Sequence, residues 1–197
     1  MKSWFSADYH LGHDNIRKYC HRPFKTLEEM DNTLINNWNA RVSPDDTVIH
    51  LGDFCFKNSP GGKSGEGSIT KSSSYMSRLN GNKVMVRGNH DRNNSTKAII
   101  ESMMIKHGGL EMFLTHIPPD NTFAVPDFTD LILCGHVHGA WKHKVIKYPE
   151  SRPPMMILNV GVDVWNFRPI DINEIIEYLA KVPEWKEIHG GMSSLQD

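Results

Sequence analysis

Five short apolar or β-branched segments of this chain each stop at a cluster of Asp, His, Gly or Asn. These segments cover residues 4–7, 47–51, 83–87, 111–114 and 131–134. Short apolar runs bounded by polar turn residues are typical of buried β-strands. Ligands of open α/β sheets usually collect at the carboxyl ends of the strands, so the repetition points to one shared site. The sequence therefore predicts an α/β fold whose function lies where these strands end.

Helical patterns lie between and after the expected strands. Thr26 and Glu29 have the spacing of a capping box, and the apolar side chains that follow share one face of a helix reaching about Asn39. The other expected elements are a short helix from Asp14, helices at residues 95–104 and 173–181, and strands at 145–148 and 155–160. Neither an internal repeat nor a boundary divides the chain, so we expect a single domain at 1–189 and a flexible tail at 190–197.

Charge and cysteine content narrow the function classes. The 22 Lys and Arg nearly balance the 23 Asp and Glu, which disfavours a surface built mainly for nucleic acid or anionic lipid and leaves local basic patches open. The 3 cysteines are far apart and provide neither a disulfide framework nor a thiolate zinc site. The N-terminus lacks a signal-like apolar stretch, and no long apolar run follows it. We expect a cytoplasmic protein without membrane contact.

The polar clusters at the strand ends are rich in metal-binding groups. They are Asp8-x-His10, Gly52-Asp53, Gly88-Asn89-His90-Asp91, Thr115-His116 and Gly135-His136-Val137-His138. Each alone is compatible with an ordinary turn, and it is their joint appearance that indicates a site. Oxygen and nitrogen ligands without thiolate suit Mn²⁺, Fe²⁺ or Zn²⁺ better than Ca²⁺ or a purely Mg²⁺ site. Two neighbouring cations would need a bridging anion, and a carboxylate in the middle of the set is the natural bridge.

The order and content of these clusters resemble the calcineurin-like metallophosphoesterases. The pattern of that family is D-x-H, G-D, G-N-H-[DE], H and G-H-x-H, and every position is present between residues 8 and 138. Residues 57–62 and 159–166 also resemble stretches of small, single-domain members from bacteria and phages. The resemblance implies a four-layer α/β/β/α sandwich with two mixed β-sheets.

The resemblance also implies a role for each residue of the clusters. One metal would be held by Asp8, His10, Asp53 and His138, and a second by Asp53, Asn89, His116 and His136. Asp53 would then be the bridge, and Mn²⁺ is the expected ion, with Fe²⁺, Zn²⁺ or Ni²⁺ as alternatives. His90 would contact the phosphate and protonate the leaving oxygen, while Asp91 would orient the His90 ring.

Further residues are candidates for substrate contact. They are His13, Arg17, Lys57, Lys63, Lys71, Arg92 and Trp165. The Gly- and Ser-rich segment 57–74, which carries the lysines, reads either as a solvated loop or as a phosphate-contacting lid. His13 has packing of the short helix as its alternative, and Trp165 either stacks on a base or closes the core. His50 is expected to be either a hydrogen-bonded core residue or a residue that supports the metal ligands, and Cys55 and Cys134 to be buried packing residues.

The expected activity is hydrolysis of a phosphate ester by metal-activated hydroxide at a dinuclear centre. A small phosphodiester or nucleotide-type substrate is favoured, because 197 residues leave little material for a restrictive cap. Two alternatives remain open: a nuclease or RNA-end processing enzyme with nucleic acid as its partner, and a non-catalytic metal-binding scaffold.

Overall fold

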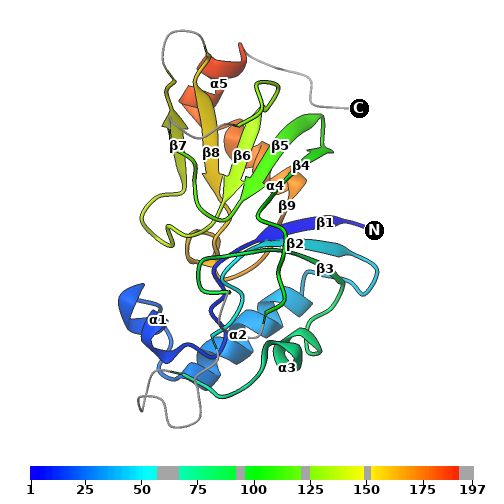
Figure 1. The fold of residues 1–197 in the computed structure, drawn as a ribbon, viewed down its shortest axis with the longest axis vertical. Coiled ribbons are helices and arrows are strands. Elements are labelled where there is room, and N and C mark those ends of the chain that lie inside the picture. Colours follow the sequence, from blue (N-terminus) through cyan, green and yellow to red (C-terminus); the bar gives the residue numbers. More distant parts are fainter. Residues whose placement is uncertain (57–66, 92–95, 121–124, 149–151, 191–197) are drawn as a thin grey trace.

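The computed structural model describes residues 1–56, 67–91, 96–120, 125–148 and 152–190 and contains two β-sheets (Figure 1). The first sheet has the order β3-β2-β1-β9. Its strands are β1 (Ser3–Ser6), β2 (Thr47–Leu51), β3 (Asn82–Val86) and β9 (Ile170–Asp171). The first three strands are parallel and β9 pairs antiparallel with β1, so the sheet is mixed.

The second sheet is also mixed and has the order β4-β5-β6-β8-β7. Its strands are β4 (Ser102–His107), β5 (Leu110–Thr115), β6 (Leu131–Cys134), β7 (His143–Ile146) and β8 (Met155–Asn159). Strands β5, β6 and β8 are parallel, and the edge strands β4 and β7 run antiparallel to their neighbours. The expected α/β class with two mixed sheets is confirmed.

The main core lies where the two sheets face each other. Leu51 of β2 and Leu114 and Leu133 of the second sheet are fully buried in one apolar cluster. Each fully buried leucine side chain contributes about 2 kcal/mol of apolar transfer free energy. This cluster sets the distance between the strand ends of the two sheets and therefore the geometry of the loops that follow them.

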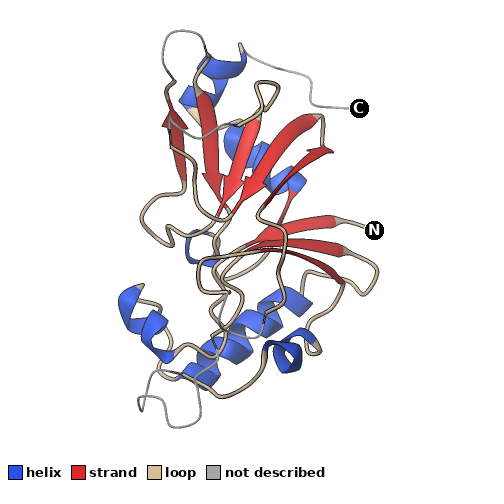
Figure 2. Ribbon diagram, in the orientation of Figure 1, coloured by secondary structure: helices blue, strands red, loops and turns tan. Residues whose placement is uncertain are grey.

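Helices cover the outer face of the first sheet (Figure 2). They are α1 (Asp14–Tyr19), α2 (Leu27–Asn39) and α3 (Ser72–Met76). Helix α2 buries Leu34 and Trp38 in the same apolar cluster as Trp4 of β1. The helices α4 (Ile172–Leu179) and α5 (Pro183–His189) and the 3₁₀ turn η1 (Val162–Val164) complete the described elements.

Helices α4 and α5 do not form a layer on the outer face of the second sheet, as a strict four-layer arrangement would require. Leu179 of α4 and Trp185 of α5 belong to the cluster between the sheets. Among the described residues, the outer face of the second sheet is covered by the loop residues Val125, Trp141 and Tyr148 rather than by a helix. The chain therefore closes its second sheet with loops on the face away from the first.

Two local expectations were wrong. The helix expected at 95–104 is replaced at its end by β4, which pairs with β5 through a hairpin. The turn contains Gly108 and Gly109, both with positive φ, and a Gly-Gly turn between apolar runs favours a hairpin over a helix. The capping box is half formed: the Glu29 N–H donates to Thr26 Oγ1, but the Glu29 carboxylate accepts from the backbone N–H of Lys25.

The helix expected at 173–181 is confirmed as α4, and α5 was not anticipated. Except for Gly190, which ends α5, the expected tail at 190–197 lies outside the described residues, and the single-domain organisation stays a prediction. None of the helices in the described ranges is long and apolar enough to span a membrane.

Candidate metal centre

The loops that follow β1, β2, β3 and β6 are held together by hydrogen bonds. The backbone N–H of His10 donates to Asp53 O at 3.0 Å, which joins the loops after β1 and β2. The N–H of His90 donates to Asp53 Oδ1 at 2.9 Å, and the N–H of His136 donates to Asp8 Oδ2 at 2.9 Å. These bonds tie the predicted clusters into one site at the strand ends.

Most of the predicted ligands adopt a backbone conformation that non-glycine residues avoid. Positive φ values occur at Asp8 (60°), His10 (50°), Asp53 (53°), His136 (72°) and His138 (48°). The left-handed region costs a non-glycine residue roughly 1–2 kcal/mol. Strained residues persist where the surrounding structure demands them and cluster at functional sites. Five in one cluster indicate that this geometry is maintained for ligand placement.

Two glycines allow the backbone to approach the carboxylates closely. A Cβ atom on Gly88 would lie 2.2 Å from Asp53 Oδ1, and one on Gly161 would lie 2.5 Å from Asp8 Oδ2. Both distances are far inside van der Waals contact, so any side chain there would displace a carboxylate. The glycine of the G-N-H motif is thus required by packing against Asp53.

The structure brings all seven predicted ligand residues together. The ligand atoms of Asp8, His10 and His138 lie within 4.8 Å of one another, and so do those of Asp8, Asp53 and His116. Asp53 Oδ2 lies 3.4 Å from both His10 Nε2 and His116 Nε2. The remaining two predicted ligands are linked to this set, because Asn89 Oδ1 lies 2.8 Å from His116 Nε2 and 2.9 Å from His136 Nδ1.

These donors fit a metal ion. His10 is only 1% exposed, and in the described part of the chain neither of its ring nitrogens has a hydrogen-bond partner. Burying such a group without a partner is costly, and coordination to a cation would remove the cost. Carboxylate, amide and imidazole donors without thiolate suit Mn²⁺, Fe²⁺ or Zn²⁺.

The two buried carboxylates differ in their electrostatics. Burial raises the pKa of Asp8 to about 6, against the opposing charges of His116 and His138. Burial also disfavours ionised Asp53, but the hydrogen bond from His116 and the charge of His10 hold the pKa of Asp53 well below its usual range. Asp53 is therefore ionised throughout the physiological range, whereas Asp8 holds a proton in mildly acidic solution.

Metal binding is expected to release one additional proton at about pH 5 compared with about pH 7.5, because a proton on Asp8 must leave before its carboxylate coordinates. The sign follows from the raised pKa of Asp8: protonation of its carboxylate lowers the affinity about tenfold per pH unit below about pH 6, in addition to the proton that His138 releases at both pH values. Calorimetry of Mn²⁺ binding in buffers of different ionisation enthalpy counts the protons. Equal proton release at both pH values would contradict the protonated state of Asp8.

Sequence reasoning missed a buried ion pair behind His138. Arg22 donates from Nε and Nη2 to the two carboxylate oxygens of Asp163 at 2.8 and 2.9 Å, and also to Asp8 O at 2.6 Å. Asp163 Oδ2 in turn accepts from His138 Nδ1 at 3.0 Å. This contact leaves His138 Nε2 as the available ligand atom, the arrangement by which carboxylates orient metal-binding histidines.

The contacts of the His138 ring also determine its charge. Burial lowers the pKa of His138, but the hydrogen bonds with Asp163 and Cys20 raise it to about 10. Asp163 lies within residues 159–166, which the family resemblance had singled out, whereas no motif surrounds Arg22. Arg22 could be found only from the folded chain.

Asp163→Asn is expected to weaken Mn²⁺ binding about 10–100-fold, because an amide orients His138 less strongly than a carboxylate does. Calorimetric titration of the metal-free variant measures the loss. Arg41→Ala is the control, since it removes a different, partly buried ion pair, the one with Glu174. Unchanged Mn²⁺ affinity in a folded Asp163→Asn protein would show that the carboxylate has no positioning role.

The predicted acid and its partner lie at the same edge. The His90 ring is exposed, and its centroid lies 5.4 Å from that of His10. Asp91 is buried and accepts backbone N–H groups of Gly88, Asp53 and Phe54 at 2.7, 2.9 and 3.2 Å. These bonds indicate that Asp91 holds the loops after β2 and β3 together. Its expected role in orienting the His90 ring stays a prediction.

The candidate substrate residues divide by position. His13 stacks on Phe56 with ring centroids 4.5 Å apart and lines the same cavity as His90. Arg17 instead binds Asp14 and the carbonyl oxygens of Phe24 and Lys25, which fixes the end of α1. The remaining lysines and arginine are Lys71, exposed at the start of α3, and Lys57, Lys63 and Arg92, which lie outside the described residues.

Trp165 is packed in the core rather than exposed at the site. It is 7% exposed, and its Nε1 donates to Asn159 O at 2.7 Å.

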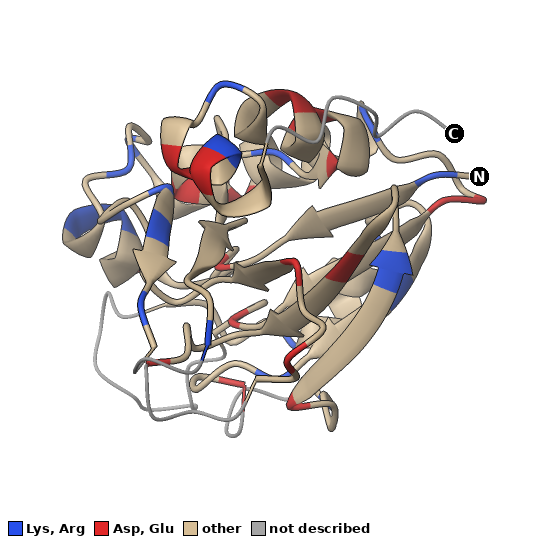
Figure 3. Ribbon diagram, turned by 90° about the horizontal axis from the view of Figure 1, so that it is seen from above, with Lys and Arg blue, Asp and Glu red and all other residues tan. Residues whose placement is uncertain are grey.

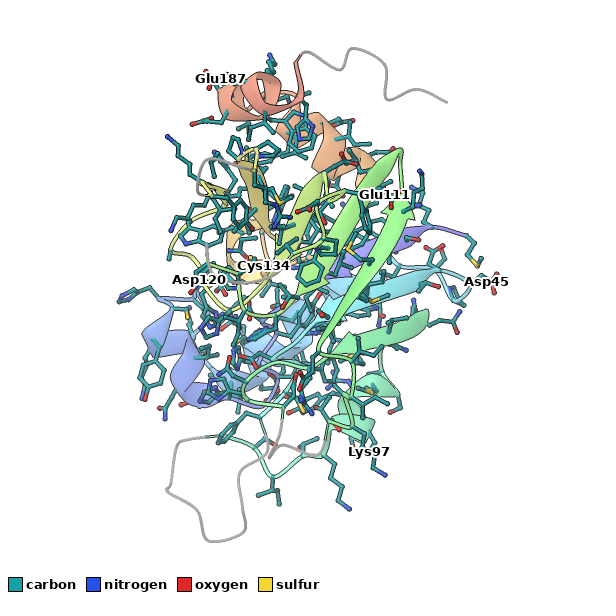
Figure 4. All side chains as sticks on the ribbon, turned by 45° about the horizontal axis from the view of Figure 1, so that its top comes forward. Asp45, Lys97, Glu111, Asp120, Cys134 and Glu187 are labelled. Carbon is teal, nitrogen blue, oxygen red and sulfur yellow. The ribbon has the colours of Figure 1, made fainter. Side chains whose placement is uncertain are left out.

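His50 is buried as expected, but among the described residues its ring nitrogens have no hydrogen-bond partner, so the expectation of a hydrogen-bonded group was wrong. Cys55 and Cys134 are buried as expected, and Cys134 lies near the middle of the molecule, whereas Asp45 and Glu187 lie at its periphery (Figure 4).

The two mixed sheets and the carboxylate, amide and imidazole cluster at their strand ends define an α/β protein with a candidate metal site. Residues 1–165 match the model of the calcineurin-like phosphoesterase superfamily domain. The chain belongs to this superfamily, which implies a phosphorylated substrate.

Relatives of similar length occur in archaea, phages and bacteria. An uncharacterised protein of Methanocaldococcus jannaschii is 34% identical over 180 residues, covering 91% of this chain and 92% of its own. The gene 66 protein of Mycobacterium phage L5 is 24% identical, covering 95% and 98%. A crystal structure of a protein of unknown function from Aquifex aeolicus has a TM-score of 0.63 and 25% identity, covering 90% and 98%.

Proposed function

We propose that this protein hydrolyses a small phosphodiester or nucleotide-type substrate with two bound divalent cations, Mn²⁺ being the preferred ion. The observation that carries the proposal is the position of Asp53, whose Oδ2 lies 3.4 Å from a histidine of each ligand group. A carboxylate placed between two sets of donors is the bridge that a pair of cations requires.

The residues of the chain have distinct tasks in this proposal. The cations, when bound, activate a water molecule and neutralise charge on the phosphate oxygens. Asp53 lies between the two ligand groups and fixes their relative position. It also accepts the backbone N–H of His90, so the proposed acid is attached to the metal site. His90 donates a proton to the leaving oxygen as the phosphorus–oxygen bond breaks.

Water rather than a side chain is the proposed nucleophile. Cys55 and Cys134 are buried, and burial raises the pKa of both thiols, so neither provides a reactive thiolate. Phosphoryl transfer depends mainly on positioning and electrostatic stabilisation, which the cluster of ligands and His90 can supply without a covalent step.

The alternatives have less support. A scaffold would not need His90, yet this residue is present and exposed beside the ligand groups. For a nuclease, the described Lys and Arg residues are spread among Asp and Glu and do not gather along one face (Figure 3). A continuous track for a long anionic strand would need such a cluster.

A substrate panel with Mn²⁺ tests the proposal. It compares phosphomonoesters, 2′,3′- and 3′,5′-cyclic nucleotides, dinucleotides and short RNA, each with and without a chelator. We expect chelator-sensitive hydrolysis of small diesters. Preference for RNA would favour the nuclease, and equal inactivity across the panel would favour the scaffold.

A further inference from the structure

Two separate cavities open on the candidate metal centre. One, of about 560 Å³, is lined by Asn89 and His116 together with the charged residues Arg87, Glu101 and Asp120. The other, of about 650 Å³, is lined by His10, His138 and His90 and lies against α1. We call the second the α1 cavity. The ligand groups therefore lie between two spaces of different chemistry.

The position of His90 distinguishes the two cavities. Among the described residues, His90 lines the α1 cavity and is absent from the lining of the other. A general acid must lie within hydrogen-bond reach of the oxygen that it protonates. The leaving oxygen, and with it the leaving group, must then extend from the metal site into the α1 cavity.

The α1 cavity is lined mainly by imidazole, aromatic and apolar side chains. Its described lining contains no Asp, Glu, Lys or Arg. Tyr19 at its rim is 70% exposed, and its ring meets the edge of His13, which is itself stacked on Phe56. Val137 and Ala140 add apolar surface to the lining. An exposed aromatic ring beside apolar side chains is suited to a planar group. Once His138 coordinates a cation and His90 has given up its proton, the described lining offers no side chain of permanent charge.

We propose that the α1 cavity binds the leaving half of a phosphodiester as an uncharged planar alcohol, a nucleoside or an aryl alcohol, with Tyr19 stacking on its ring. This inference rests on the proposed function and names its substrate class. Water adds a hydroxyl group to phosphorus, the bond from phosphorus to the leaving oxygen breaks, and His90 supplies the proton of the departing alcohol. The proton that the water molecule loses restores the protonated form of His90. The products are a phosphomonoester and a neutral alcohol, so leaving groups that carry phosphates of their own are disfavoured.

Binding of adenosine tests the cavity without requiring turnover. Ligand-observed NMR with the full chain is expected to detect adenosine binding. Tyr19→Ala is expected to weaken adenosine binding about three- to tenfold, the value of one aromatic contact. Tyr19→Phe keeps the ring and is expected to recover most of the loss. Phe128→Ala, which removes another exposed aromatic ring, is the control.

Hydrolysis provides the second arm of the test. Two ethyl aryl phosphates are compared, one with a 4-nitrophenyl leaving group and one whose nitrophenyl ring carries an added carboxylate. We expect the carboxylate to raise KM, and Tyr19→Ala to raise KM only for the uncharged substrate. Unchanged adenosine binding in Tyr19→Ala, or equal KM for the two substrates, would overturn the inference. If no phosphate ester is hydrolysed, the proposed function fails, and adenosine binding still decides what the cavity accepts.

Discussion

Asp53→Ala is expected to lower Mn²⁺-dependent hydrolysis of bis(p-nitrophenyl) phosphate by about a thousandfold or more. Asp53 combines three contacts that other ligands do not share. Its Oδ2 lies 3.4 Å from His10 Nε2 and from His116 Nε2, and its Oδ1 accepts the N–H of His90. Removing the carboxylate separates the two ligand groups and also releases the loop that carries the acid.

The experiment measures p-nitrophenol release together with the metal content of the purified variant. Thermal unfolding of the metal-free protein shows whether the variant still folds. Asp127→Ala is the matched control, because the Asp127 side chain is 93% exposed and its only described ion pair, with Arg152, is at the surface. A folded Asp53→Ala protein that binds two Mn²⁺ ions and keeps substantial activity would show that Asp53 is not the bridge.

That the seven predicted ligand residues gather at one edge could be predicted from the sequence, because each directly follows, or lies within a few residues of, a buried apolar strand. The carboxyl ends of parallel strands such as β1 and β2 lie at the same edge of the sheet. The proximity of residues such as Asp8 and Asp53 can therefore be predicted without knowing how the side chains pack. The left-handed backbone at both positions could not be predicted, since it depends on glycines such as Gly88 that pack against the carboxylates.

Contacts between distant segments were outside the reach of sequence patterns. Arg22 and Asp163 are separated by 141 positions, and only the fold brings their side chains together. The charge state of Asp8 is equally non-local, because it depends on burial and on His116 and His138. The missed strand β4 had a local signal in Gly108 and Gly109, but a helical spacing of apolar residues upstream competed with it. Local periodicity is weaker information than tertiary pairing.

His90→Ala is expected to keep Mn²⁺ affinity and to lower kcat about 10²–10⁴-fold for a diester with a poor, alkyl leaving group. The ring is exposed, and only its backbone N–H is bonded to the carboxylate of Asp53, so truncation of the side chain removes no hydrogen bond from the ligand set. Calorimetry of Mn²⁺ binding and steady-state kinetics separate the two effects. His107→Ala, on the edge strand β4, is a control for loss of an imidazole elsewhere.

The dependence on the leaving group identifies the acid. An alkoxide is too basic to depart without a proton, whereas p-nitrophenolate departs readily as an anion, so protonation matters only for the first. The same His90→Ala variant should therefore lose much less activity with bis(p-nitrophenyl) phosphate than with the alkyl diester. If the two losses are equal, His90 acts by holding the phosphate rather than by proton transfer. Full activity on the alkyl diester would remove His90 from the mechanism and place the proton donor elsewhere in the α1 cavity.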